Sequence, residues 1–338
     1  MAWVTARQLE SSADLRALWN DGFEPSVLNR AGAADVALIW IDHEWWRGFT
    51  ACFIHGGWLH WGVNMVSLHA LWPWCVAAFG RRSALMALLL GGALASLAST
   101  YAAEGVVVVG VSGGLFALAS MVVYERGGVC RDIRGQVVGA VGLCVLVGFA
   151  LPLAWPTGPR LANIGHAAGW VVGGLWGIGI SGGAGKPWWS WRLPVHVAIT
   201  VTTFGITEFR HRTTFSEVCG LHLLQDGRLE EAIVLLDVAH GQRPQSAIRA
   251  NALGYALSLS GQRLEQAAAL SDIALASDPA NSSYLDTRGW IHCRAGETEE
   301  GERSLRAALA AAGGPDITIA EHLRDCGLVR TIQFEPSD

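Results

Sequence analysis

Charged residues are scarce in this sequence, and the scarcity is local. Only 16% of the 338 residues are charged, whereas about 25% is usual in a soluble globular protein. Between Gly48 and Tyr124 the one acidic residue is Glu104, and residues 133–207 contain none. Charged residues return at ordinary density from Glu208 onward. This contrast predicts a membrane-embedded part followed by a soluble part.

The sequence also lacks a basic stripe and any CxxC motif. Without a stripe of lysine and arginine residues, nucleic acid is not an expected partner. The seven cysteines have no regular spacing, which favours packed thiols over a disulfide framework or a metal site. Four of them lie in or beside apolar segments, namely Cys52, Cys75, Cys130 and Cys144.

The first 43 residues contain no apolar run of about 20 residues, the length that spans a bilayer. They also lack a basic segment followed by an apolar one, so no cleavable signal peptide is expected. Five apolar segments that follow are candidate spans, roughly Phe49–Phe79, Ser83–Ala103, Val106–Tyr124, Gln136–Trp155 and Leu161–Ser181. A sixth and weaker segment, Leu193–Phe209, contains several threonines, and the sequence leaves open whether it crosses.

Arginines set the expected orientation. Arg81 and Arg82 lie between the first two spans, and Arg126, Arg131 and Arg134 lie between the third and fourth. The positive-inside bias therefore places these connections in the cytoplasm. The segment before the first span and the loop near Glu104 then face outward.

Glycines recur with a long period in the last third of the chain. Gly220, Gly254 and Gly289 are 34 and 35 residues apart, and a second series follows at the same intervals, Gly227, Gly261 and Gly296. This pattern resembles tetratricopeptide repeats, in which two-helix units stack because one unit cannot bury its apolar face alone. An unrelated helical bundle is the alternative. Such repeats offer a concave surface for a peptide or protein partner.

Three short motifs carry polar groups on three different spans. The first is HGGWLHWGVN, which contains His55, His60 and Asn64; the last two are four residues apart and share one face of a helix. The second is GVSG around Ser112, and the third is Gly165 with His166. By the expected orientation all three lie near the outer side of the membrane. Polar groups inside a span are costly, so they are functional candidates.

Small residues favour a close approach between the second and third motifs. Gly110 and Gly113 flank Ser112, and glycines recur every fourth residue from Gly165 to Gly177. Such a stripe lets two helices pack closely in lipid. We expect His166 to reach the Ser112 hydroxyl, which needs a base to become a nucleophile.

These spans offer no carboxylate for a triad, so a Ser–His dyad is expected. The developing oxyanion needs donors, and the candidates are the Ser112 backbone N–H, His60 and Asn64. Neither a metal nor an organic cofactor is needed. A rival interpretation, a metal site formed by His55, His60 and His69, lacks the HExxH motif and a nearby acid.

Together these motifs resemble the rhomboid family of intramembrane serine proteases. The resemblance covers roughly residues 27–181 and includes EWWR (Glu44–Arg47), FIHGGWLHWGVNM, GVSG and GHAAGWVVGG. It implies that Ser112 is the nucleophile and His166 the base, with His60 and Asn64 in the oxyanion hole. It further implies that His55 supports the site and that Phe116 places its ring against the catalytic histidine.

The resemblance also sets the expected fold and location. It implies an all-α protein, a polytopic transmembrane helical bundle followed by a soluble helical-repeat domain, in a bacterial inner membrane. Expected partners are transmembrane protein substrates, the lipid bilayer and a partner of the repeats. The family's first transmembrane helix is not found before the EWWR element. A non-cutting relative that binds transmembrane clients is therefore the alternative function.

The expected domain organisation has four parts. Residues 1–48 form an N-terminal segment and external loop, and residues 49–182 form the protease core. Residues 183–212 form a linker with a possible extra helix. Residues 213–338 form the repeats.

Overall fold

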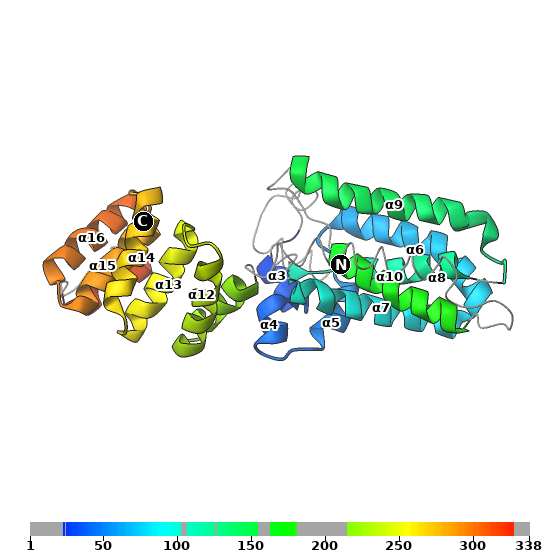
Figure 1. The fold of residues 1–338 in the computed structure, drawn as a ribbon, viewed down its shortest axis with the longest axis horizontal. Helices are drawn as coiled ribbons and strands as arrows, with labels where there is room; N and C mark the ends of the chain where they lie inside the picture. The colour runs from blue at the N-terminus through cyan, green and yellow to red at the C-terminus, as the bar shows by residue number, and fades with distance from the viewer. Residues whose placement is uncertain are drawn as a thin grey trace, which may run out of the picture. The chain divides into compact units, whose positions relative to one another are not determined.

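The computed structural model describes residue 23 and residues 25–102, 107–125, 127–154, 163–180 and 215–327. The chain divides into two compact units, Met1–Phe215 and Ser216–Asp338, and each is described by itself (Figure 1). The predicted linker, including the weaker span Leu193–Phe209, lies outside the described residues. Within the described residues the protein is helical apart from one two-stranded sheet.

The first unit begins with short elements and continues with long helices. The short elements are α3 (Pro25–Arg30), β1 (Ala34–Asp35), α4 (Val36–Trp40), α5 (Arg47–Thr50) and η1 (Ala51–Phe53). The long helices are α6 (Trp58–Phe79), α7 (Arg81–Tyr101), α8 (Ser112–Tyr124), α9 (Arg131–Ala154) and α10 (Asn163–Ile180). Strand β2 (Val107–Val108) pairs antiparallel with β1, with Ala34 opposite Val108.

Two of the predicted spans have different bounds in the structure. The segment Phe49–Phe79 is interrupted between η1 and α6, because Gly56 and Gly57 are poor helix formers. The segment expected to start at Val106 becomes helical only at Ser112, because residues 107–108 pair with β1 instead. Both breaks lie beside the predicted motifs.

A buried arginine holds the external segment together. Arg47, the last residue of the EWWR element, is 8% exposed. Its Nη1 donates to the carbonyl oxygens of Asn29 at 2.7 Å and Ala33 at 3.1 Å, and its Nε pairs with Glu44. A buried charge is stable only when it is paired and hydrogen-bonded in this way. The arginine thereby joins α3, the approach to β1 and α5.

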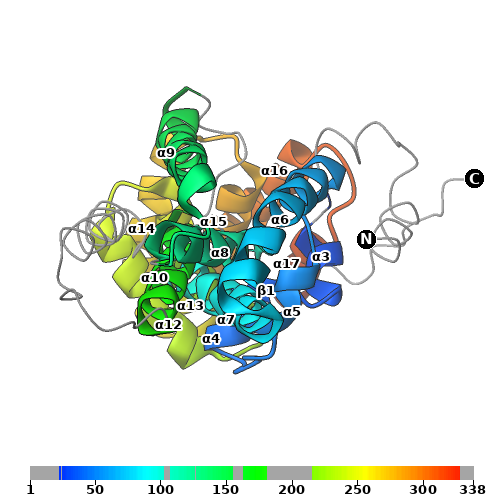
Figure 2. The same cartoon turned by 90° about the vertical axis from the view of Figure 1, so that its right-hand side faces the viewer.

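Helix α8 is the centre of the bundle. It packs against α6, α7 and α10, which surround it in the view along the helices (Figure 2). Gly169 and Gly173 of α10 lie against the backbone carbonyls of Gly113 and Ala117, so no side chain separates the two helices. This confirms the close packing predicted from the glycine stripe. Helices in lipid associate through such contacts because burial of apolar surface does not favour it there.

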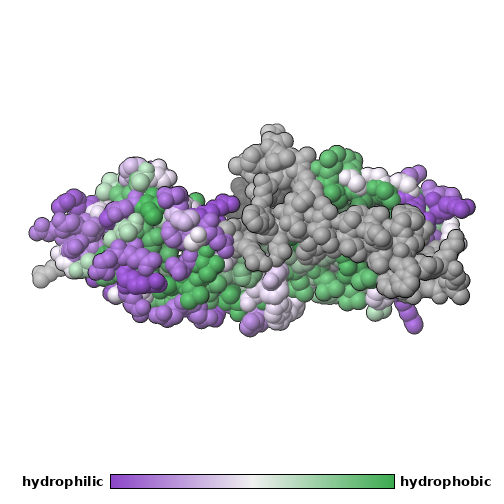
Figure 3. Space-filling model, viewed as in Figure 1, coloured by the Kyte–Doolittle hydropathy of each residue, from purple (hydrophilic) through white to green (hydrophobic). Residues whose placement is uncertain are grey.

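The described helices of this unit are strongly apolar. By length and composition, α7 is the one helix among the described residues that could cross a membrane, and α8 is a shorter apolar helix. On the face shown in Figure 3, the described surface of this unit is mainly hydrophobic, whereas that of the repeat unit is mainly hydrophilic.

The second unit consists of helix pairs. A helix over residues 215–225 precedes α12 (Leu229–Gln242), α13 (Ala247–Ser260), α14 (Leu264–Ser277), α15 (Ser282–Ala295), α16 (Thr298–Ala311) and α17 (Ile317–Asp325). The first glycine of each repeat faces a leucine in the second helix of its pair: Gly220 faces Leu236, Gly254 faces Leu270, and Gly289 faces Leu305. The glycine of the second series ends the first helix with a positive φ in all three pairs. Each of the two glycine series therefore occupies the same structural position in all three helix pairs.

The cysteines follow the sequence expectation with one exception. Cys52, Cys75, Cys130 and Cys219 are buried and form no disulfide, and Cys144, which also forms none, is exposed on α9. Cys293 and Cys326, however, form a disulfide whose Cα atoms are 5.6 Å apart, a usual separation. The expectation that all cysteines are packed thiols was wrong here, because the 33-residue separation is almost one repeat period and brings α15 and the end of α17 together.

We predict that Gly173→Ala destabilises the first unit. The new methyl group would collide with the Ala117 backbone, which cannot rotate away, and overpacking of this kind costs about 1–3 kcal/mol. Gly142 of α9 is the matched control, because a Cβ there meets nothing within 4 Å. Thermal unfolding in detergent micelles should show a lower Tm for Gly173→Ala and an unchanged or higher Tm for Gly142→Ala. Equal Tm values for the two variants would contradict this packing.

Candidate active site

The structure brings together two residues that are 54 positions apart in the sequence. His166 Nε2 of α10 lies 3.0 Å from Ser112 Oγ of α8, which is hydrogen-bond distance. Both residues are partly buried. When Nε2 is unprotonated it can accept the hydroxyl proton, so the pair has the geometry of a nucleophile and its general base. The proton position depends on the tautomer.

Ser112 is the first residue of α8. The first N–H groups of a helix have no partner within the helix, and they lie at the positive end of its dipole. The extended residues before Ser112 are fixed from both sides, by the β1–β2 pairing and by a 2.9 Å hydrogen bond from Gly110 N–H to the Ala51 carbonyl. The sequence thus turns from strand to helix at the predicted nucleophile. A negative charge developing beside Ser112 would be stabilised there.

The imidazole of His166 is held by an aromatic ring. Phe116 lies one turn after Ser112 on α8, and its ring is stacked on His166 with 4.3 Å between centroids and 5° between planes. On the opposite side of the pair, Gly165 approaches Ser99 and Ala95 of α7. The orientation of His166 therefore depends on packing from two helices. Its role as a base stays a prediction.

His60 and Asn64 lie beside Gly110, which precedes Ser112 by two residues. A Cβ built on Gly110 would be 3.0 Å from His60 Nε2 and 3.4 Å from Asn64 Nδ2. Asn64 is 4% exposed, and its Nδ2 has no hydrogen-bond partner among the described residues. A buried donor without a partner is costly, so this amide is free to donate to a ligand. Both donors predicted for the oxyanion are thus close to Gly110, two residues before Ser112.

His55 supports this group from outside α6. It is buried at 3% exposure, and its ring contacts that of His60 edge-on, with 5.2 Å between centroids. The Gly56–Gly57 break is what allows the chain to place His55 against the first turn of α6. His55 therefore packs against His60, and its supporting role stays a prediction.

Within the described residues, no carboxylate contacts His166. The buried or paired acids of this unit have other partners. Asp35 caps α4 by accepting from the N–H groups of Ala37 and Leu38. Glu125 accepts from the N–H groups of Gly128 and Cys130 at the far end of α8. A Ser–His dyad without a carboxylate stays a prediction.

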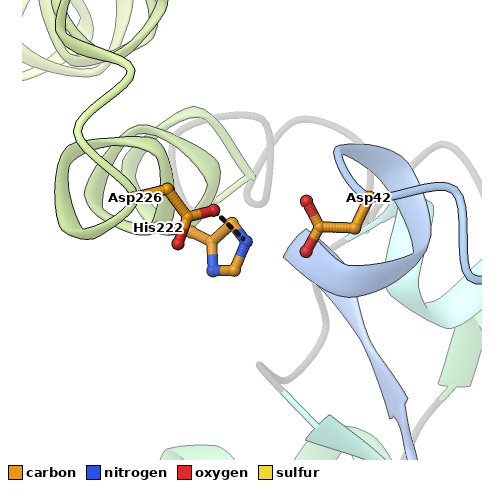
Figure 4. A group of neighbouring side chains, drawn as sticks. All are labelled: Asp42, His222 and Asp226. Atoms are coloured by element: carbon orange, nitrogen blue, oxygen red, sulfur yellow. Dashed lines mark ion pairs between the residues drawn. The ribbon is translucent and has the colours of Figure 1, made fainter.

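The rival metal interpretation gains no support from this geometry. His69 is exposed and lies nine residues after His60 on α6, two and a half turns away and so on the opposite side of the helix. Figure 4 shows another group of titratable residues, in which His222 Nε2 lies 3.3 Å from Oδ2 of Asp226, in the turn that follows the helix over residues 215–225. Asp42, also drawn, belongs to the first unit, so the three are not assigned as a metal site.

Sequence reasoning missed the contribution of α7. Its buried face is mostly made of small residues, namely Ala84, Ala87, Gly91, Gly92, Ala95, Ser96 and Ser99, together with Leu88 and Thr100. On this face Gly91 packs against Ala117 of α8, and Ala95 packs against Gly113 of α8. Spacing by four, from Gly91 through Ala95 to Ser99, was the available signal. It is the same signal that identified α10.

Comparisons with known proteins relate part of this chain to one family. Residues 42–182 match the family model of the Rhomboid domain. The chain is 29% identical over 152 residues to RHOMBOID-like protein 1 of Arabidopsis thaliana, covering 45% of this chain and 39% of that one. It is 25% identical over 265 residues to Rhomboid protease GluP of Bacillus subtilis, covering 75% and 50%. These matches support the rhomboid family and an integral membrane protein.

The repeat unit has a partial match of its own. The chain is 38% identical over 82 residues to a TPR repeat-containing protein of Pseudomonas aeruginosa, covering 24% of this chain and 14% of that one. The chain spans half or less of the length of the curated relatives it matches. No solved structure is significantly similar to it.

We predict that Gly110→Ala inactivates Ser112 toward a fluorophosphonate probe. Gly110 has φ +109°, and an added methyl would lie 2.8 Å from His60 Cε1, so it would displace that ring. Gly80→Ala is the matched control, because Gly80 has φ +81° but open space around it. Both variants bear the cost of a positive φ, about 1–2 kcal/mol, but only Gly110→Ala disturbs the site. If the probe labels both variants at equal rates, the position of the His60 ring does not affect the reactivity of Ser112.

Proposed function

We propose that this protein is an intramembrane serine endopeptidase that cleaves transmembrane protein substrates. The observation that carries the proposal is the 3.0 Å contact between Ser112 Oγ and His166 Nε2. Three separate elements, η1 to α6, α8 and α10, supply the groups around it. The Rhomboid match over residues 42–182 and the relative named as a rhomboid protease add support.

The length of α8 favours a substrate inside the membrane. The helix has 13 residues, which span about 20 Å at ~1.5 Å per residue. The hydrocarbon core of a bilayer is about 30 Å thick. If Tyr124 is at the inner face, Ser112 is therefore about 10 Å below the outer face. A transmembrane segment that enters from the side and partly unwinds could present a peptide bond at that depth.

The proposed reaction has two stages. In the first, Oγ of Ser112 transfers its proton to His166 Nε2 and attacks the carbonyl carbon of the substrate. The oxyanion that forms accepts hydrogen bonds from the Ser112 N–H, His60 and Asn64 Nδ2. His166 then gives its proton to the leaving amine nitrogen, the C–N bond breaks and an acyl-enzyme remains.

In the second stage water replaces the amine. His166 takes a proton from water, whose oxygen attacks the acyl carbon. Collapse of the second tetrahedral intermediate breaks the bond to Oγ, which recovers the proton from His166. The second product leaves with a carboxylate, and the dyad returns to its initial state without any cofactor.

The repeat unit has a separate proposed role. Its stacked helix pairs suit a peptide or protein partner, so we assign it the recruitment of substrate or of a regulatory protein. The proposed location is a bacterial inner membrane. A non-cutting protein that binds transmembrane clients is the remaining alternative, and the intact contact between Ser112 and His166 argues against it.

We predict that Ser112→Ala and His166→Ala each abolish cleavage of a single-span substrate in proteoliposomes, because either change removes half of the dyad. Ser120→Ala is the matched control: Ser120 is fully buried on the same helix, and its hydroxyl has no partner among the described residues. Its activity should be retained. Substantial cleavage by either dyad variant, or none by the unmutated chain, would refute the proposed mechanism.

We further predict that Asn64→Ala lowers kcat while leaving the substrate KM nearly unchanged. An oxyanion donor acts mainly in the transition state, and removal of one typically costs about 10²–10³ in kcat. Steady-state kinetics in detergent micelles can separate the two constants. A rise in KM alone would instead place Asn64 in substrate binding.

A further inference from the structure

A polar cluster is buried within the repeat unit between α13, α15 and α17. His322 of α17 and Asp286 of α15 are 6% and 8% exposed, and His322 Nδ1 lies 2.8 Å from Asp286 Oδ1. His322 Nε2 lies 3.3 Å from the Tyr255 hydroxyl of α13. The Trp290 ring is stacked on the imidazole, with 4.6 Å between centroids and 21° between planes.

Tyr255, Asp286 and Trp290 surround the planar imidazole of His322, and we call these three residues its pocket. A carboxylate can only accept, so Nδ1 of His322 carries a hydrogen. Burial, together with the charges of Asp286 and Glu321, raises the pKa of Tyr255, so its hydroxyl stays protonated. The pocket thus has an acid at one edge, a hydroxyl at the other and an indole face beneath. A planar group that donates to the carboxylate and stacks on the indole, such as an imidazole or a guanidinium, fits this combination.

Helix α17 enters this pocket as an amphipathic helix does. Its nine residues bury Ile319 and Leu323 on either side of His322, at 3% and 1% exposure. Positions i, i+3 and i+4 lie on one helical face. The two aliphatic side chains pack with Leu305 and Ala308 of α16. This is the way in which a peptide helix anchors in a groove.

Helix α17 is connected to the rest of the unit at both of its ends. It follows Gly313 and Gly314, where a Cβ would meet nothing within 4 Å. Two consecutive glycines leave the backbone of this connection many allowed conformations. At its other end Cys326 is joined to Cys293 of α15. A buried polar pair such as His322 and Asp286 is costlier to bury than aliphatic residues of similar size, and retention of such a pair is best attested where it selects a partner or register.

We infer that α17 is a built-in ligand of the repeat unit, and that the pocket of Tyr255, Asp286 and Trp290 binds a partner's amphipathic helix. That helix would carry His or Arg between two aliphatic residues, spaced like Ile319 and Leu323. The inference rests on the proposed recruiting role of the repeats and is independent of the dyad.

The disulfide controls which helix occupies the pocket. A dithiol reductant transfers two electrons and two protons to the Cys293–Cys326 bond and is itself oxidised to a disulfide, leaving two thiols. Loss of the bond frees the end of α17, but the chain still presents it at an effective concentration of about millimolar. Because α17 would still compete for the pocket, binding of a partner helix must be tested on a variant whose substitutions displace α17 from it. We call this variant the ejected chain.

The ejected chain is the full-length protein in detergent micelles with Ile319→Asp, Leu323→Asp, Cys293→Ser and Cys326→Ser. The probe is a fluorescent peptide of residues 315–327 with Cys326→Ser, followed by anisotropy. We expect it to bind the ejected chain and to bind the unsubstituted oxidised chain at least about tenfold more weakly. Asp286→Asn in the ejected chain, or His322→Glu in the peptide, should weaken binding more than about tenfold. His322→Arg in the peptide should be tolerated.

Three results would overturn the inference. One is no binding by an ejected chain whose repeats keep their circular dichroism. Another is loss of that signal on ejection, which would make α17 an inseparable part of the fold. The third is peptide binding that is weakened neither by His322→Glu in the peptide nor by Asp286→Asn in the ejected chain.

Two further measurements complete the test. In the unsubstituted chain, hydrogen exchange of the α17 amides should be at least about tenfold faster after reduction; equal rates would refute control by the disulfide. Cleavage of the single-span substrate by the ejected chain is measured in the same preparation. Peptide binding without any Ser112-dependent cleavage would refute the proposed protease and leave this inference standing.

Discussion

The carbonyl groups of Gly113 and Ala117 on α8 lie against Gly169 and Gly173 on α10, with no side chain between the two helices. The geometry of the proposed active site depends on this contact, because it fixes how far α10 is from α8. The distance between Ser112 and His166 and the stacking of Phe116 on the imidazole both follow from it. On its other face α8 meets the small residues of α7, so three backbones approach closely around one serine.

The two units use glycine in opposite ways. In the first unit a glycine admits a neighbouring backbone, as expected where lipid offers no hydrophobic gain from association and close packing must supply the energy. In the repeat unit Gly220, Gly254 and Gly289 each admit a leucine side chain from the partner helix. There the burial of an aliphatic side chain away from water supplies the energy. Glycine therefore allows backbone contact between helices in the first unit and burial of leucine away from water in the repeat unit.

Periodic features of the structure could be predicted from the sequence. The four-residue spacing of glycines in α10 predicts its approach to α8, and the spacing of His60 and Asn64 places both on one face of α6. The 34- and 35-residue intervals predict equivalent positions in the repeats, and the positive φ angles of Gly227, Gly261 and Gly296 agree. Each of these signals is local or strictly repeated.

Features that depend on distant pairing could not be predicted in this way. The late start of α8 is set by the two-residue pairing of Val107 and Val108 with β1, about 70 residues earlier. The contacts of Arg47 with two carbonyl groups leave no trace in composition. Cys293 and Cys326 were masked by the repeat itself, because their separation is close to the period at which any two equivalent residues recur.

Helix α10 is the last of the helices that build the site, and His166 follows Ser112 by 54 residues. A ribosome adds about 5–20 residues per second, so for several seconds the growing chain carries the serine without the imidazole. During that interval α8 can insert beside other newly made membrane segments without the base needed to attack them. In the proposed protease, the order of elements along the chain thus keeps the nucleophile inactive during synthesis until α10 docks against α8.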